Sequence, residues 1–177
     1  YLVKHEKNTI FRAEKMLMMP DLFAYFLTGE CRSEFTEATT TQLIDQKARG
    51  WHLQLIEAIG IPKRIFAPLI QPGERYGDLK QELAEEFRME PVPVYACASH
   101  DTASAVMAVP TEEEHFAFLS CGTWTLFGTE LRRPLVSEKA LKMGLTNEAG
   151  SSGTTTLLKN IMGLWLIQET RRWYNST

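Results

Sequence analysis

A short apolar run that ends in polar residues constrains the fold more than any other stretch of this sequence. The run from Val92 to Ala98 is apolar and β-favouring, and Ser99, His100 and Asp101 follow it directly. A continuous apolar run of this length is typical of a strand that is buried on both faces of a sheet. Small residues of helical character then extend from Asp101 to Val109. The pattern predicts a strand, a polar turn and a short helix, as in α/β folds.

Asp101 stands where α/β proteins place their ligands. Loops at the C-terminal ends of strands open onto the crevice between helices, and the small residues after Asp101 leave room for a substrate beside it. The alternative is that Asp101 only caps the following helix, and the local pattern leaves both interpretations open. A hydrolase triad of Ser99, His100 and Asp101 is excluded, because adjacent residues on a strand point to opposite faces.

Composition indicates a globular protein of one medium domain or two small ones. The chain has 177 residues, 44% of them hydrophobic and 23% charged, with a formal net charge of −3. This charge gives no preference for nucleic acid, and no apolar run approaches the roughly 20 residues of a membrane span. Three cysteines form no Cys-x-x-Cys pair, which favours reduced, buried thiols in a cytoplasmic protein: Cys31, Cys97 and Cys121.

The first half of the chain reads as helices joined by polar stretches. Residues 14–27 have a helical pattern that Pro20 interrupts, so we expect a break there and a second helix from Pro20. Further helices are predicted at residues 50–60 and 78–87. Residues 33–45 are rich in small hydroxyl side chains and indicate a surface loop or, alternatively, a loop close to a ligand.

The polar stretch Thr111–His115 is the expected domain boundary, which divides the chain into residues 1–110 and 111–177. After it, the pattern predicts a β-hairpin, one more strand, a loop and a long final helix: residues 116–119 and 124–129, 143–147, 150–153 and 157–174.

Two features of this second part could bind a ligand. The hairpin turn Ser120–Thr123 can direct backbone N–H groups and a hydroxyl at a phosphate, although most Gly-Thr pairs in hairpins only form the turn. On the predicted final helix, Asn160 and Gln168 lie eight residues apart, roughly 12 Å along the axis. That spacing suits a sugar and a nucleotide in one extended ligand arrangement. Two ordinary surface amides would have the same spacing.

Three stretches in this order resemble the FGGY carbohydrate kinases: residues 98–106, 120–124 and 158–169. Residues 19–43 resemble part of that family's first domain. The resemblance implies an α/β, actin-like ATPase fold of two ribonuclease-H-like domains, with the end of the first domain and the start of the second in this chain. It also implies a longer kinase, so we expect residues 1–177 alone to be inactive. Cys121 departs from the small hydroxyl residue expected there.

The resemblance implies ATP-dependent phosphorylation of a sugar, with Asp101 as the general base. His100, Asp101, Thr102 and Asn160 would contact the sugar. In the family, the ATP phosphates are bridged by Mg²⁺. Gly122 and Thr123 would lie against these phosphates, and Gln168 would lie on the nucleotide side.

Within the family, His100 and the stretch from Asn160 to Trp165 favour L-rhamnulose as the acceptor, which would give L-rhamnulose 1-phosphate. Fuculose, xylulose or a similar sugar is the nearest alternative. A non-catalytic actin-like module that binds a nucleotide or a partner is another, although such a module needs no general base. The expected partners are the sugar and ATP, without nucleic acid or membrane. An exposed apolar edge of a partial second domain would favour self-association.

Overall fold

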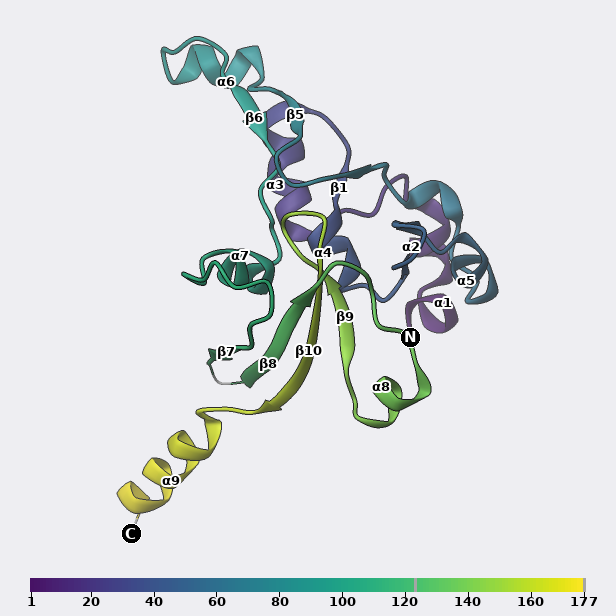
Figure 1. Cartoon of the computed structure of the whole chain (residues 1–177). Helices are drawn as coiled ribbons and strands as arrows, with labels where there is room; N and C mark the ends of the chain where they lie inside the picture. Colours follow the sequence, from purple (N-terminus) through teal and green to yellow (C-terminus); the bar gives the residue numbers. More distant parts are fainter. Residues whose placement is uncertain (123, 177) are drawn as a thin grey trace. The chain divides into compact units, whose positions relative to one another are not determined.

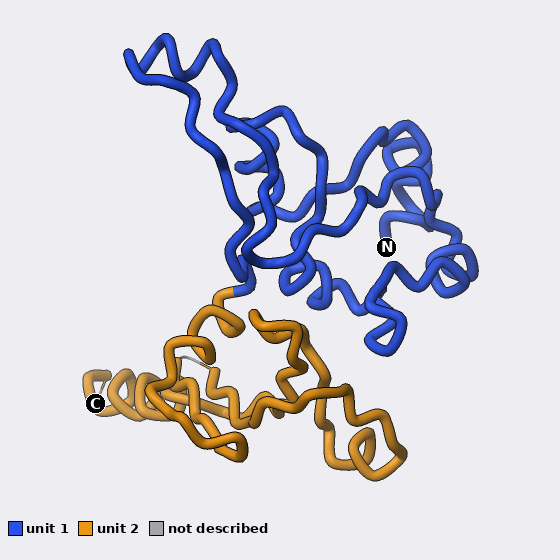
Figure 2. Tube along the Cα trace, turned by 45° about the horizontal axis from the view of Figure 1, so that its top comes forward, with its two compact units in different colours: residues 1–100 blue, residues 101–177 orange. Residues whose placement is uncertain are grey.

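The computed structural model describes residues 1–122 and 124–176 (Figure 1). The chain divides into two compact units, unit 1 (Tyr1–His100) and unit 2 (Asp101–Thr177), which Figure 2 distinguishes by colour. The division falls between His100 and Asp101, whereas the sequence predicted a domain boundary at residues 110/111.

Unit 1 combines helices with short strands. Its elements in chain order are α1 (Leu2–His5), α2 (Lys7–Arg12), α3 (Met19–Thr28), β1 (Ser33–Glu34), α4 (Phe35–Thr39), β2 (Ile44–Asp45), β3 (Gly50–Trp51), α5 (Leu53–Ala58), a 3₁₀ helix (Lys63–Ile65), β4 (Leu69–Ile70), β5 (Arg75–Asp78), α6 (Gln81–Glu86) and β6 (Pro93–Tyr95). Strand β1 pairs in parallel with β4, while β2 pairs with β3 and β5 with β6 in antiparallel fashion. One buried cluster packs α3 against these strands: Ala24, Ile70, Tyr76 and Ala96.

Helix α3 confirms the helix predicted from Pro20. Pro20 lies in its first turn, where a missing N–H group is tolerated, and Gly29 ends it with a left-handed φ of 79°. The helix predicted for residues 14–18 is wrong. Met16 instead forms a parallel β-bridge with Phe66, because the apolar side chains of this stretch pack against a neighbouring segment.

The prediction of a surface loop at residues 33–45 is also wrong for its first half. Residues Ser33–Thr39 form β1 and α4, and Glu37 is the only member that is not buried. Small hydroxyl side chains occur here because they bond to nearby backbone groups inside the unit, as the Thr39 hydroxyl does to the Thr36 carbonyl at 2.7 Å.

Strand β6 confirms the position of the predicted central strand but not its burial. Pro93 and Tyr95 are exposed, and among the described residues β6 pairs only with β5. An apolar β-favouring run shows that a strand forms, whereas its burial depends on which elements cover it. Helices α5 and α6 are shorter than the predicted helices at 50–60 and 78–87.

The cysteines are less buried than composition suggested. Cys31 is half-buried, and Cys97 and Cys121 are exposed as free thiols. Cys121 is the last residue of β7 (Phe118–Cys121), and Cys31 and Cys97 lie in segments that connect helices and strands.

Unit 2 is built on a four-stranded antiparallel sheet in the order β7-β8-β10-β9. Its elements are α7 (Asp101–Met107), β7 (Phe118–Cys121), β8 (Trp124–Leu131), α8 (Glu138–Lys142), β9 (Thr146–Ala149), β10 (Thr155–Met162) and α9 (Trp165–Ser176). The predicted hairpin is confirmed as β7 and β8, and the predicted extra strand as β9, three residues further along.

Helix α7 covers one face of this sheet. Val106 of α7 packs on Phe118 of β7 and Leu158 of β10, and all three are buried. Gly128 on β8 faces the same cluster, since it is the register partner of both Phe118 and Leu158. A Cβ atom at Gly128 would lie 2.5 Å from the Leu157 carbonyl oxygen, so this close packing requires glycine.

The long helix predicted for residues 157–174 is wrong in its first part. Residues Thr155–Met162 form β10, and only Trp165–Ser176 are helical. The β-branched residues Thr155 and Thr156 favour a strand, and Gly163 interrupts any helix that would continue through it. Leu158, Ile161 and Trp165 have the three- and four-residue spacing of a helix face, but they lie on β10 and at the start of α9.

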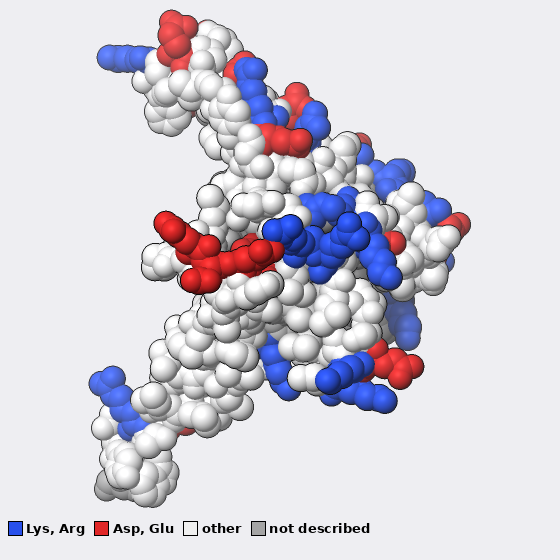
Figure 3. Space-filling view, viewed as in Figure 1, with Lys and Arg blue, Asp and Glu red and all other residues white. Residues whose placement is uncertain are grey.

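Charged side chains of both signs lie on the surface. Acidic side chains form a patch over the stretch that follows α7 (Figure 3), where Glu114 pairs with Arg132 at 2.6 Å. Over the two described ranges, no helix is both long and apolar enough to cross a membrane.

Candidate functional site

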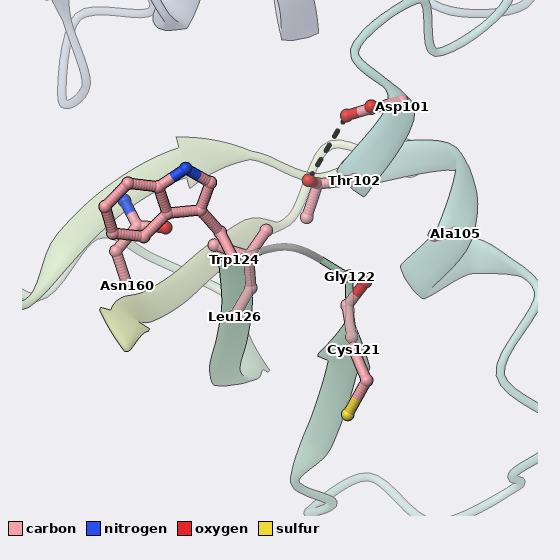
Figure 4. A pocket seen from close by; sticks show the side chains of 9 residues that line it. Asp101, Thr102, Ala105, Cys121, Gly122, Trp124, Leu126 and Asn160 are labelled. Carbon is pink, nitrogen blue, oxygen red and sulfur yellow. Dashed lines mark hydrogen bonds between the residues drawn. The ribbon is translucent and has the colours of Figure 1, made fainter. Parts of the chain in front are cut away.

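A cavity of about 590 Å³ lies in unit 2 between the start of α7 and the sheet (Figure 4). One wall comes from α7 and the other from β7, β8, β10 and the turn between β7 and β8. The lining residues are Asp101, Thr102, Ala105, Ser120, Cys121, Gly122, Trp124, Leu126 and Asn160.

Strand register explains why the sheet wall is made of these residues. Ser120, Leu126 and Asn160 are paired across β7, β8 and β10, so their side chains form one row on one face. Phe118 and Leu158, two residues earlier on their strands, lie on that face too, under α7. The apolar cluster thus fills one end of the space between helix and sheet, and the cavity occupies the other.

Helix α7 supplies the acidic group of the cavity. Asp101 is exposed in the first turn of the helix, and Thr102 beside it is buried. The Thr102 hydroxyl lies 3.3 Å from Oδ1 of Asp101, an interaction drawn as the dashed line in Figure 4. Ala105 follows one turn later and leaves the cavity open beside the carboxylate.

The turn between β7 and β8 is held by the chain that follows β10. The N–H of Gly122 donates to the Trp124 carbonyl at 2.8 Å, and the Gly122 carbonyl accepts the Leu164 N–H at 2.9 Å. Gly163 makes this approach possible, because a Cβ atom there would lie 2.6 Å from the Gly122 carbonyl oxygen. The Gly122 N–H is therefore engaged within the turn rather than directed at a phosphate.

The cavity brings together four of the residues expected to contact ligands: Asp101, Thr102, Gly122 and Asn160. Ser120 and Cys121 of the predicted hairpin turn line it too. Gln168 is exposed on α9 and does not line it, and the idea that Asn160 and Gln168 share one helix is wrong, because Asn160 lies on β10. His100 is half-buried at the end of unit 1. Thr123 lies outside the described residues.

Sequence reasoning missed the uncharged lining residues Ala105, Trp124 and Leu126. The alternation of side chains along a strand could have identified Trp124 and Leu126, since both share a face with Ser120 once the hairpin register is known. Trp124 is 64% exposed and presents its ring beside the cavity.

A second polar arrangement, in unit 1, was also missed. The buried carboxylate of Glu34 accepts hydrogen bonds from Thr36, Glu37 and Ser99. Beside it, Oδ1 of buried Asp21 accepts the Glu34 N–H at 2.8 Å, and burial raises the pKa of Asp21 to about 6. Glu34 stands at the start of a hydroxyl-rich stretch, but Glu is not among the residues that usually cap a helix, so the sequence carried no clear signal for this group.

The described residues hold no cluster of three or more His, Cys, Asp or Glu side chains that could bind a metal ion. The described residues that line the cavity include neither lysine nor arginine. The polar side-chain groups of its described lining residues are one carboxylate, two hydroxyls, one thiol, one amide and the indole N–H of Trp124.

The resemblance inferred from the sequence is confirmed. Residues 1–108 match the model for the N-terminal domain of the FGGY family of carbohydrate kinases. The chain belongs to this family. Its fold is the α/β, actin-like ATPase fold of these kinases.

Rhamnulokinases are among the curated relatives of the chain. The chain is 39% identical over 170 residues to a rhamnulokinase of Bacteroides thetaiotaomicron, covering 96% of this chain and 35% of the relative. It is 43% identical over 177 residues to one of Halalkalibacterium halodurans, covering 99% of this chain and 38% of the relative. The chain therefore spans little more than a third of the length of these relatives.

Solved structures of sugar kinases share the fold. A xylulose kinase ("xyloylose kinase") from Brucella ovis superimposes with a TM-score of 0.79 at 24% identity, over 92% of this chain and 33% of that one. A ligand-bound xylulose kinase from Lactobacillus acidophilus gives a TM-score of 0.74 at 19% identity, over 89% and 31%.

Proposed function

We propose that the full-length gene product is an ATP-dependent sugar kinase that converts L-rhamnulose to L-rhamnulose 1-phosphate. The observation that carries this proposal is the cavity of unit 2, in which the Asp101 carboxylate and the Asn160 amide line one space from different elements. The identity of 37–43% to proteins named rhamnulokinase supports L-rhamnulose among the possible ketoses.

In the proposed reaction, Asp101 is the general base. The sugar hydroxyl oxygen attacks the γ-phosphorus of ATP, and the bond between the γ-phosphorus and the oxygen that bridges it to the β-phosphate breaks, so that ADP leaves. The hydroxyl proton passes to the Asp101 carboxylate. Phosphoryl transfer depends mainly on positioning and charge stabilisation, so a carboxylate that orients the hydroxyl suffices as the protein's acid–base group. The exposure of Asp101 on an open cavity wall is consistent with this role.

We assign sugar binding to His100, Asp101, Thr102 and Asn160. An amide offers both a donor and an acceptor to vicinal hydroxyl groups, and Asn160 is exposed on the sheet wall of the cavity. Thr102 is buried with its hydroxyl near Asp101, so it would restrain that carboxylate while contacting the sugar.

ATP is the proposed phosphoryl donor, with its phosphates near Gly122 and Thr123 and its nucleoside toward Gln168. Gly122 lines the same cavity as Asp101, which supports placing the phosphates there, and contacts to them would come from groups other than the Gly122 N–H, which is engaged within the turn. Mg²⁺ would accompany the ATP phosphates and neutralise part of their charge, and we assign it no step of its own.

We also propose that residues 1–110 belong to the sugar-binding N-terminal domain and residues 111–177 to the nucleotide-binding domain. The family match to residues 1–108 supports that boundary. Helix α7 would then join the two, since its residue Val106 packs on the sheet of unit 2.

We expect residues 1–177 by themselves not to turn over any ketose. Transfer of a phosphoryl group requires positive charge around the γ-phosphate, and neither lysine nor arginine is among the lining residues that the structure describes.

A ketose panel tests the function. The full-length gene product is assayed with ATP and L-rhamnulose, L-fuculose, D-xylulose or D-ribulose, and ADP release is measured. The proposal predicts the highest kcat/KM with L-rhamnulose. A higher value with another ketose would support a different sugar kinase, and no turnover with any would contradict the kinase assignment.

A further inference from the structure

The Glu34 carboxylate makes many hydrogen bonds, and the proposed reaction leaves it unused. The residue is fully buried, and its two oxygens accept five hydrogen bonds. The donors are Thr36 N (2.8 Å), Thr36 Oγ1 (2.5 Å), Glu37 N (3.1 Å), Ser99 N (3.1 Å) and Ser99 Oγ (2.7 Å).

Two of these five bonds reach a segment far away in the sequence. The bonds from Thr36 and Glu37 make Glu34 the N-cap of α4, which is an ordinary structural role. The bonds from the N–H and the hydroxyl of Ser99 are not part of that cap. They attach residue 99 to the start of α4.

The next residue is attached to the same group. The His100 N–H donates to Oγ1 of Thr36 at 3.2 Å, while that hydroxyl donates to Glu34. The backbone N–H groups of both residues that precede Asp101 are therefore held, directly or through Thr36, by one carboxylate. Asp101 is joined to His100 by a single peptide bond. By restraining the backbone of Ser99 and His100, Glu34 therefore also restrains the backbone position of Asp101.

A carboxylate is the group that this arrangement requires. All five partners are donors, and a carboxylate accepts only. An amide in its place would direct an NH₂ group at some of these donors and leave buried groups unsatisfied.

We propose that Glu34 is a positioning residue for Asp101. It acts on Asp101 by holding the Ser99–His100 segment in place. This inference rests on the proposed kinase reaction with Asp101 as its base. A general base acts only within hydrogen-bond reach of its proton, and a displacement of about 1 Å can lower a rate by about 100-fold.

The test is a double-mutant cycle in the full-length gene product. The variants Glu34→Gln, Asp101→Asn and the double variant are compared with the unvaried protein in kcat, KM for ATP and fraction folded. We expect Glu34→Gln to lower kcat about 10- to 100-fold per folded molecule, with KM for ATP changed less than about threefold. In the Asp101→Asn background, the same change should lower kcat less than about threefold, because the base that Glu34 positions no longer acts.

Two further variants keep the test decisive if Glu34→Gln folds poorly. Ser99→Ala removes one hydroxyl from the carboxylate and leaves the α4 cap intact, so it should lower kcat about 3- to 10-fold with the same non-additivity. Asp21→Asn is the control for changing a buried carboxylate in the same region. Its Oδ1 atom can still accept the Glu34 N–H, so kcat should remain within about twofold.

The outcomes separate the two proposals. An unvaried protein that is inactive on every ketose would contradict the kinase assignment, and the role of Glu34 would fall with it. With an active protein, equal loss from Glu34→Gln in both backgrounds would show a purely structural role and overturn the inference. Unchanged kcat in both Glu34→Gln and Ser99→Ala would overturn it as well.

Discussion

Oδ1 of Asp21 accepts the backbone N–H of Glu34 at 2.8 Å, deep in unit 1, where both residues are 0% exposed. The same oxygen accepts the Tyr76 hydroxyl at 3.2 Å, while Oδ2 has no hydrogen-bond partner among the described residues. Burial is the main reason that the pKa of Asp21 rises to about 6 from 3.8, and the Glu34 carboxylate adds to the rise. Asp21 thus destabilises the folded state when it is ionised.

We predict that Asp21→Asn stabilises the protein at neutral pH. The folded-state pKa of Asp21 lies above the unfolded value, so the folded state binds more protons between about pH 4 and 6. The stability of the unvaried protein should therefore fall as pH rises through that window. The variant lacks this titration, and its advantage in free energy of unfolding should grow from near zero at about pH 4 to about 3 kcal/mol at pH 7.

Urea unfolding of both proteins between pH 4 and 8 measures this difference. Asp45→Asn is the control with opposite sign, because backbone N–H groups of Ala48 and Lys47 lower the pKa of Asp45. An Asp21→Asn advantage that shrinks toward neutral pH would contradict the burial argument.

Gly128→Ala should destabilise unit 2. The added Cβ atom would lie 2.5 Å from the Leu157 carbonyl oxygen and 2.8 Å from the Leu158 Cβ, so the two strands must separate. We expect a loss of about 3 kcal/mol or more in free energy of unfolding. Gly50→Ala is the comparison, since its nearest neighbouring atom would lie 4.0 Å away. Equal unfolding midpoints for the two variants would show that β8 and β10 tolerate the insertion.

Asn160→Ala should weaken sugar binding more than turnover. Removal of the amide leaves sugar hydroxyls without a partner, and we expect KM for L-rhamnulose to rise about tenfold while kcat changes less than about threefold. Lys159→Ala is the control, because alternation on β10 turns Lys159 to the opposite face of the sheet. Initial rates over a range of ketose concentrations give both constants. A fall in kcat alone would exclude Asn160 from ground-state binding of the sugar.

Helices and strands were predicted best from the sequence where the local residue pattern and the tertiary contacts favour the same structure. The hairpin of β7 and β8 follows from two apolar runs around a Gly-containing turn, and α3 from Pro20 and Gly29 at its ends. The helix prediction for most of residues Thr155–Met162 was wrong because their apolar spacing also fits a helix. Their β-branched residues and their pairing with β8 and β9 stabilise a strand instead.

The candidate site was predicted in part. Asp101, Thr102, Gly122 and Asn160 were singled out from the sequence, and they line one cavity because α7 packs on the sheet face that carries Asn160. The Glu34 group could not be predicted, since its bonds to Ser99 join segments that only the folded chain brings together. Hydroxyl-rich sequence alone does not distinguish a surface loop from a buried hydrogen-bonded turn.

The most direct test of the account is the kcat of Asp101→Asn in the full-length gene product with ATP and L-rhamnulose. Asparagine keeps the size of the side chain but cannot take the hydroxyl proton. If Asp101 is the base, kcat should fall about 100-fold or more while the Kd for L-rhamnulose, measured by calorimetry, changes less than about threefold. Turnover by Asp101→Asn close to that of the unvaried protein would contradict the assignment of Asp101 as the base.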